Sequence, residues 1–357
     1  MGACRPPAGT GPPFAAFQVT ISAMSSTDSP RPKDFLIDRP SRAALKRGLE
    51  QVFAADIAAH GPLRILHRRE NPLVSSYVAD IVQLGFADGH RERLLCKFAH
   101  GRELTPPTPH LGLAHEARVY ADVLGACPLP RPLVHGSFAD CETGALVLAM
   151  QFYPNAVPAA TSTDPTAIDC LIRWLAAFHE WAGSRLDDPR WHFLSRYDVP
   201  YYTMWLERTC ELAAPFAAEH PWLDRVVEAY RERIPLLAAA RPTVIHGEFI
   251  TRNALWDDGR ILPIDWETAA IGPAEVDVAV FTYDWHPEDV ATLQHIYAES
   301  RWGGSPPAGH ADTLLAARLY AAFHWLFGTP GGCGPERVRD HLKSLHDEAV
   351  RWGIVAG

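Results

Sequence analysis

Three oxygen-bearing side chains lie close together in the segment from Val244 to Ala279, VIHGEFITRNALWDDGRILPIDWETAAIGPAEVDVA. Glu248 follows His246-Gly247 at the end of an apolar stretch, Asn253 comes five residues later, and Asp265 comes twelve residues after Asn253. Phosphoryl transfer needs a carboxylate near the attacking hydroxyl and oxygen ligands for Mg²⁺ on the nucleotide phosphates. Mg²⁺ keeps several of its waters, so one carboxylate and one amide oxygen are enough to hold it. The segment therefore contains the side chains that phosphoryl transfer requires.

The spacing of these residues is similar to that of the protein-kinase catalytic loop. H-x-E-x-x-x-x-N in this chain corresponds to H-R-D-x-x-x-x-N, with Glu in place of Asp. We predict that Glu248 is the catalytic carboxylate that orients the attacking hydroxyl. We also predict that Asn253 and Asp265 are the metal ligands.

A lysine–glutamate pair is the second requirement, because a kinase grips the α- and β-phosphates with a strand lysine that a helix glutamate holds in place. Lys97 lies in the apolar segment LLCKF, where an unpaired charge would be costly. Glu116 shares one face of an expected helix with Leu113, Ala117 and Tyr120. We therefore predict that Lys97 and Glu116 form this pair.

The chain resembles the aminoglycoside phosphotransferase and choline-kinase-like family of small-molecule kinases. The resemblance covers roughly residues 60–300, is strongest in the block HGEFITRN…IDWE…GPAEVDVA, and extends to a helix segment LAAFH that is similar to the family's L-A-x-L-H. It implies a bilobal protein-kinase-like fold and transfer of the γ-phosphate of ATP, or of GTP, to a hydroxyl of a small molecule, with Mg²⁺. It also implies that Met150 and Phe152, at the end of the strand ALVLAM and just after it, belong to the hinge against the adenine.

Two features depart from the family's pattern. Glu248 replaces the usual aspartate, and one extra methylene moves the carboxylate by about 1.5 Å. A displacement of about 1 Å can cost on the order of 10²-fold in rate. The loop between the first two strands contains no glycine, so we expect the hydroxyls and amides of Ser75 and Ser76 to contact phosphate there.

Two interpretations of function remain open at this point. The first is an active small-molecule O-phosphotransferase whose acceptor is an aminoglycoside, another antibiotic or a hydroxylated metabolite. The second is a kinase-like pseudoenzyme that binds nucleotide or ligand without phosphoryl transfer, an interpretation that Glu248 motivates. A protein kinase is not favoured, because the sequence has no glycine-rich loop, D-F-G or A-P-E motif.

The hydrophobic patterns predict an α+β fold with two lobes. In the first part of the chain, helices are expected at 41–59, with Ser41 as N-cap, and at 113–124, and strands at 64–67, 76–86, 93–98, 133–138 and 145–151. After residue 164 the pattern becomes helical, with further helices at about 202–218, 222–239, 288–299, 310–327 and 335–352. We expect a disordered tail over 1–34 and a nucleotide-binding antiparallel-sheet lobe with one helix over 35–152. A larger, mainly helical lobe over 153–357, interrupted by two short strands, would carry the catalytic and metal-binding loops and the substrate site.

Composition excludes several other classes of protein. The 357 residues are 47% hydrophobic and 21% charged, which is typical of a globular chain of about two domains. The net charge of −9 argues against nucleic acid or an anionic membrane as a partner. The seven cysteines have no zinc-like spacing and indicate a reducing compartment. With no apolar run of about 20 residues, we expect a cytoplasmic protein whose partners are a nucleoside triphosphate and a hydroxylated small molecule.

Several neighbouring residues have structural interpretations. We expect His246 to brace its own loop by hydrogen bonds, Asp277 to brace the loop around Gly272-Pro273, and His179 to be a buried helix histidine. Glu267 could either support the metal-binding loop or contact the substrate, and the sequence does not decide between these roles.

Overall fold

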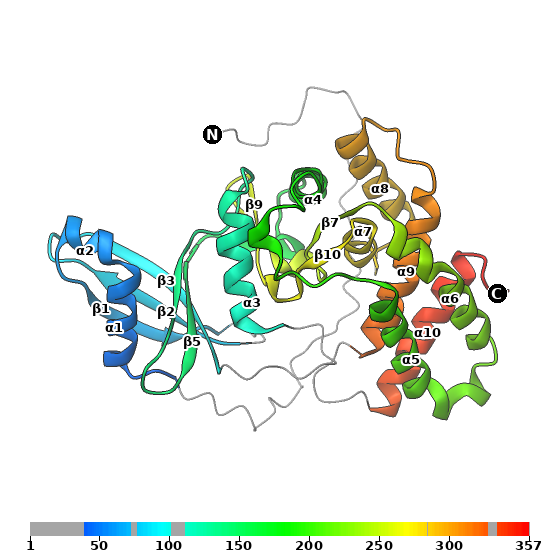
Figure 1. The fold of residues 1–357 in the computed structure, drawn as a ribbon, viewed down its shortest axis with the longest axis horizontal. Helices are drawn as coiled ribbons and strands as arrows, with labels where there is room; N and C mark the ends of the chain where they lie inside the picture. The colour runs from blue at the N-terminus through cyan, green and yellow to red at the C-terminus, as the bar shows by residue number, and fades with distance from the viewer. Residues whose placement is uncertain (1–38, 73–76, 101–110, 284, 328–333, 357) are drawn as a thin grey trace. The chain divides into compact units, whose positions relative to one another are not determined.

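The computed structural model describes residues 39–72, 77–100, 111–283, 285–327 and 334–356 (Figure 1). The expected disordered tail at 1–34 and the two loop serines, Ser75 and Ser76, lie outside the described residues. The described chain divides into two compact units. One contains residues 39–163 together with Arg252–Thr268, and the other contains Asp164–Thr251 together with residues 269–356.

A five-stranded antiparallel sheet forms the largest part of the first unit, with its strands in the order β1-β2-β3-β5-β4. The β2–β3 hairpin turns at Asp88-Gly89, as the sequence predicted, and Gly89 has a φ of +94°, which favours glycine. All five expected strands are present. They are β1 (Arg64–Glu70), β2 (Val78–Gly85), β3 (Arg91–His100), β4 (Val134–Ala139) and β5 (Ala145–Gln151).

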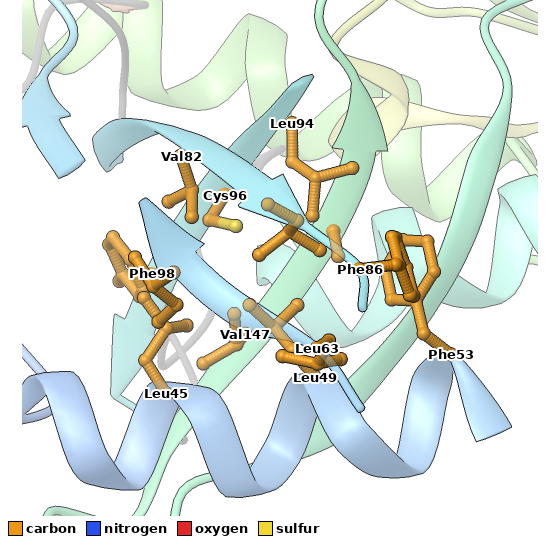
Figure 2. Close-up of a cluster of buried hydrophobic side chains, with 13 residues drawn as sticks. Leu45, Leu49, Phe53, Leu63, Val82, Phe86, Leu94, Cys96, Phe98 and Val147 are labelled. Carbon is orange, nitrogen blue, oxygen red and sulfur yellow. The ribbon is translucent and has the colours of Figure 1, made fainter. Parts of the chain in front are cut away.

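One face of this sheet packs against α1 (Arg42–Val52). Ser41 caps α1 by accepting a hydrogen bond from the Ala44 amide, as expected, and the chain breaks at Phe53 before α2 (Ala54–His60). Figure 2 shows Leu45 and Leu49 of α1 and the neighbouring Phe53 packed against the sheet. The sheet side of this core includes Val82, Leu94, Cys96, Phe98 and Val147.

The opposite face of the sheet carries Lys97. Successive side chains of a strand point to opposite faces, so burial of Cys96 and Phe98 against α1 places Leu95 and Lys97 on the other side. The helix α3 (Gly112–Arg118) contacts β3 and β5. The expected helix at 113–124 is regular only to Arg118, and the chain continues in a wider π-type turn, Val119–Val123.

A short hairpin completes the first unit. It consists of β8 (Ala254–Asp257) and β9 (Arg260–Pro263), and β6 (Val157–Pro158) pairs with β8. This hairpin carries the segment in which the metal ligands were predicted.

The second unit is mainly helical, and two of its strands, β7 (Pro242–Ile245) and β10 (Ala270–Pro273), pair with each other. Within the described residues it contains α4 (Ala167–Gly183), α5 (Val199–Ala213), α6 (Leu223–Ala239), α7 (Glu275–Phe281), α8 (Pro287–Trp302), α9 (His310–Phe327) and α10 (Pro335–Arg351). The expectation of two short strands within residues 153–357 was wrong, because β6, β7, β8, β9 and β10 all lie in that range. The helix α7 was not predicted, since all of its residues are buried and no polar face marks a helical period.

In the ranges that the structure describes, no helix combines the length and the hydropathy needed to cross a bilayer.

Candidate active site

Lys97, Glu116 and Asp265 come together in the first unit. Lys97 is 4% exposed on β3, and its Nζ donates to Glu116 Oε1 at 2.8 Å and to Oε2 at 3.1 Å. The same Nζ contacts Asp265 Oδ1. Glu116 and Asp265, which lie 19 and 168 positions from Lys97 along the chain, thus bind the same ammonium group.

The charges of this cluster are strongly coupled. Burial works to lower the pKa of Lys97, but the carboxylates of Asp265 and Glu116 outweigh burial, so the pKa lies above its usual value and Lys97 stays protonated. Burial raises the pKa of Glu116, and attraction to Lys97 offsets only part of that rise. A further positive charge near Asp265 would therefore relieve the excess of carboxylates over ammonium groups.

The β8–β9 hairpin positions both predicted metal ligands. Asn253 directly precedes β8, Asp265 follows β9 by two residues, and the Ile264 amide donates to the Asn253 carbonyl at 2.8 Å. This backbone bond closes the base of the hairpin, so the hairpin brings the two segments side by side. Beyond it, the buried Trp266 donates from its indole N–H to the Pro263 carbonyl at 3.1 Å and fixes the turn.

Asp265 has an unusual backbone conformation. Its φ is +62°, in the left-handed region, which costs most side chains about 1–2 kcal/mol and is adopted by Asp and Asn more readily than by others. Strain of this kind persists where the surrounding structure over-determines it, and it clusters at functional sites. The conformation of this turn is therefore in keeping with the predicted functional role of Asp265.

The donor set fits Mg²⁺. The pair consists of a carboxylate and an amide, which supply the oxygen ligands that Mg²⁺ prefers. The Asp265 side chain is 27% exposed, so a hydrated ion can reach it. Glu116 is fully buried and already binds Lys97 with both oxygens, so it is not available as a ligand.

Tyr77 and Glu267 extend the same cluster, and the sequence analysis missed Tyr77. The Tyr77 hydroxyl donates to Glu267, the Tyr77 ring centroid lies 5.9 Å from Lys97 Nζ, and burial together with the charge of Glu267 raises the tyrosine's pKa. The Glu267 carbonyl accepts from the Leu111 amide at 3.0 Å, just before α3. Glu267 therefore ties the loop that carries the predicted metal ligand Asp265 to the residue before α3 and to Tyr77.

The hinge residues implied by the resemblance lie on and after β5. Met150 is buried and pairs with Leu95 of β3, on the face that carries Lys97. The Phe152 amide donates to the Arg93 carbonyl at 2.8 Å. Their contact with a base stays a prediction.

Glu248 belongs to the second unit, where Asp277 of α7 fixes its loop. The Asp277 carboxylate accepts from the amides of His246 at 2.7 Å and Gly247 at 2.8 Å, and Gly247 has a φ of +85°, which favours glycine. The Glu248 amide donates to His246 Nδ1 at 3.3 Å, which is the bracing role expected of His246. Asp277 thus braces the Glu248 loop, and the expectation that it braces the loop around Gly272-Pro273 was wrong.

A chain of buried hydrogen bonds continues from Asp277. His179 Nε2 donates to Asp277 at 3.0 Å, and His179 Nδ1 accepts from the Tyr297 hydroxyl at 2.8 Å. Arg301 donates to the same hydroxyl at 2.7 Å. Burial lowers the pKa of His179, although the carboxylate of Asp277 opposes this, so the ring stays neutral. The expectation of a buried, satisfied histidine is confirmed.

Replacing Asp277 by Asn is expected to destabilise the protein. The amide nitrogen cannot accept a hydrogen bond, so at least one of the buried N–H groups loses its partner, at a cost of about 1.5–3 kcal/mol for each bond to the charged group. Urea unfolding should show a lower midpoint for Asp277→Asn and an unchanged one for the exposed control Asp187→Asn. Equal midpoints for both variants and the wild type would contradict the bracing role.

The model of the phosphotransferase enzyme family (APH) matches residues 77–310, more than half of the chain. The chain therefore belongs to this family, and it is a small-molecule phosphotransferase of the kinase-like class. No curated protein sequence matches it at a significant level.

Solved structures with the same architecture include three kinases. The complex of the aminoglycoside phosphotransferase APH(2")-IIIa with GDP and kanamycin has a TM-score of 0.60 at 14% identity, covering 84% of this chain and 98% of that one. Choline kinase LicA from Streptococcus pneumoniae has a TM-score of 0.56 at 15% identity, covering 84% and 99%. A microcompartment-associated aminopropanol kinase has 0.55 at 14%, covering 85% and 98%. The shared feature is the α+β, protein-kinase-like fold.

Proposed function

We propose that this chain transfers the γ-phosphoryl group of a nucleoside triphosphate to a hydroxyl of a small molecule in the cytoplasm, with Mg²⁺. The observation that carries the proposal is the buried ammonium group of Lys97, bound by the inaccessible Glu116 and by the accessible Asp265. Desolvating such a cluster costs free energy that an apolar core would not, so it is a poor way to stabilise a fold. The same cluster is suited to phosphate binding, because Glu116 orients the lysine and Asp265 is left to bind a cation.

Each residue has a separate role in this proposal. Asn253 and Asp265 would hold Mg²⁺, which when bound supplies positive charge at the phosphate oxygens. Lys97, oriented by Glu116, would bind the phosphates, with Ser75 and Ser76 as further phosphate contacts and Met150 and Phe152 near the base. Glu248 would accept a hydrogen bond from the acceptor hydroxyl and orient it for in-line attack. Catalysis then comes from positioning and charge stabilisation.

The acceptor is proposed only as a hydroxylated small molecule. The similar solved structures include a kanamycin complex, a choline kinase and an aminopropanol kinase. Kanamycin, choline and aminopropanol have in common only that each carries a hydroxyl group and nitrogen. Aminoglycosides, other hydroxylated antibiotics and hydroxylated metabolites are therefore all candidates.

Mass spectrometry of an acceptor panel tests the proposal. The protein is incubated with Mg²⁺, ATP and GTP and with aminoglycosides, other hydroxylated antibiotics, amino alcohols and sugars. We expect one panel member to gain a single phosphoryl group, and the Lys97→Met variant to give no product. Nucleotide binding without product on any member would instead support the pseudoenzyme interpretation.

A further inference from the structure

A hollow of about 360 Å³ lies on the five-stranded sheet, within the size range of small-molecule sites. It is lined by His67, Arg68, Arg69, Ile81, Gln83 and Arg93. None of these six side chains is a carboxylate, and arginine is purely a hydrogen-bond donor. The hollow is therefore rich in positive charge and in donors.

The strand register places five of the six lining residues on the face that carries Lys97, whereas Arg68, which pairs with Val82, lies on the α1 face. Gln83 pairs with Arg93 and Ala79 pairs with Lys97 across β2 and β3, so Arg93 and Lys97 point to the same side. Arg93 is four residues from Lys97 along β3, which corresponds to about 13 Å. An extended nucleotide spans a comparable length from its α-phosphate to the far edge of its base.

Apolar side chains separate the lysine from the donors. Leu95 lies between Lys97 and Arg93 on this face, with Ile81 opposite it on β2 and Met150 opposite it on β5. The face thus presents a phosphate-binding ammonium group, then an apolar patch, then a row of donors. This is the order of the phosphates, the ring faces and the polar edge of a nucleotide.

Two backbone N–H groups at the end of β5 already have partners. The Gln151 amide donates to the Leu133 carbonyl at 2.8 Å, and the Phe152 amide donates to the Arg93 carbonyl at 2.8 Å. Both N–H groups are therefore already used. We therefore expect side chains on this face to contribute to the discrimination between bases.

Arg93 is the side chain placed to do this. In the part of the chain that the structure describes, no carboxylate pairs with Arg93, and its guanidinium carbon lies 5.9 Å from the Phe152 ring centroid. Arg68, in contrast, is engaged by Asp80 at 2.6 Å and by the Pro40 carbonyl at 2.7 Å. Arg93 has Gln83 directly opposite as a second donor.

We propose that Arg93, with Gln83, selects a 6-oxopurine nucleotide, so that the phosphoryl donor is GTP rather than ATP. Guanine and hypoxanthine present O6 and N7 as two acceptors, which a guanidinium binds in a bidentate way. Adenine presents an amino group at the position of O6, so the Arg93 guanidinium would face another hydrogen-bond donor. The inference rests on the proposed function, since it names the nucleotide of that same site.

Calorimetric titration with GDP, IDP and ADP in the presence of Mg²⁺ tests the inference without an acceptor. We expect GDP and IDP to bind about 10-fold more tightly than ADP, because one good bidentate contact discriminates by that order. Arg93→Gln should weaken GDP and IDP about 10-fold and change ADP by less than about 2-fold. Arg93→Lys should also lose most of the discrimination, because a lysine cannot form the bidentate pair. The matched control is Arg91→Gln, which changes an exposed arginine of the same strand outside the hollow and should leave all three affinities unchanged.

Three results would overturn the inference. ADP binding as tightly as GDP would show that the base edge is not read by donors, while leaving the phosphotransferase proposal intact. Equal weakening of ADP and GDP in Arg93→Gln would assign Arg93 to the phosphates or the ribose. Absence of binding by every nucleotide would overturn the proposed function itself.

Discussion

Replacing Asp265 by Asn is expected to lower kcat/KM for phosphoryl transfer by about 10²–10³-fold, the size of effect seen when one preorganised charge-stabilising group is removed. The substitution removes the negative charge that contacts Lys97 and that would bind Mg²⁺. It conserves shape, and Asn adopts the left-handed backbone conformation found at this position as readily as Asp. Kinetics at increasing Mg²⁺ concentrations should show that the variant needs more metal for its residual activity.

The β8–β9 turn offers a matched control for this variant. Asp258 is also an aspartate in the left-handed region, with a φ of +46°, and it lies in the same hairpin away from Lys97. Asp258→Asn should keep wild-type activity and the wild-type dependence on Mg²⁺. If Asp265→Asn behaved like Asp258→Asn, the assignment of Asp265 as a metal ligand would be wrong.

Replacing Glu248 by Gln is expected to lower kcat by about 10²–10⁴-fold, the usual contribution of a group that accepts a proton in the transition state. The carboxamide keeps the length of the side chain but loses the charge that attracts the acceptor's hydroxyl proton. The KM for nucleotide should stay within about 2-fold of the wild type, because Glu248 is assigned to the acceptor and not to the phosphates. Steady-state kinetics with varied nucleotide and varied acceptor separate these quantities.

The Glu248→Asp variant tests whether the native glutamate is correctly placed for catalysis or is a weaker substitute for aspartate. Asp277 fixes the backbone of the loop through the His246 and Gly247 amides, so the loop cannot easily move to compensate for a shorter side chain. We therefore expect Glu248→Asp to lose activity on the order of 10²-fold. A gain of activity in this variant would indicate instead that the native glutamate weakens the enzyme.

Local pattern was enough to predict part of the site. The alternation of β3 placed a lysine in an apolar strand, and the helical period placed Glu116 on the inward face of its helix, which is the pairing observed at 2.8 Å. The regular spacing of Asn253 and Asp265 around an Asp-Asp-Gly turn likewise indicated a hairpin. These features depend on short segments whose periodicity is visible in the sequence.

Other features depend on contacts that no local period encodes. Tyr77 and Glu267 are 190 residues apart, and their hydrogen bond follows only from the assembled first unit. The alternation of Tyr77 with Ala79 already placed this tyrosine on the Lys97 side of β2, and that was the available signal. The role of Asp277 was misassigned because it joins α7 to a loop about 30 residues earlier, and α7 itself is too completely buried to show a helical face.

The most direct test follows the γ-phosphoryl group itself. Nucleoside triphosphate labelled with ¹⁸O on its γ-phosphate is incubated with Mg²⁺ and the acceptor panel. Wild-type protein and Asp265→Asn are used in parallel, and the masses of the products are measured by mass spectrometry. We predict that one acceptor gains a phosphoryl group carrying all of its labelled non-bridging oxygens, and that the variant forms little of this product. A phosphorylated product formed equally by Asp265→Asn, or nucleotide binding with no labelled product on any acceptor, would contradict the account of this chain as a metal-dependent small-molecule kinase.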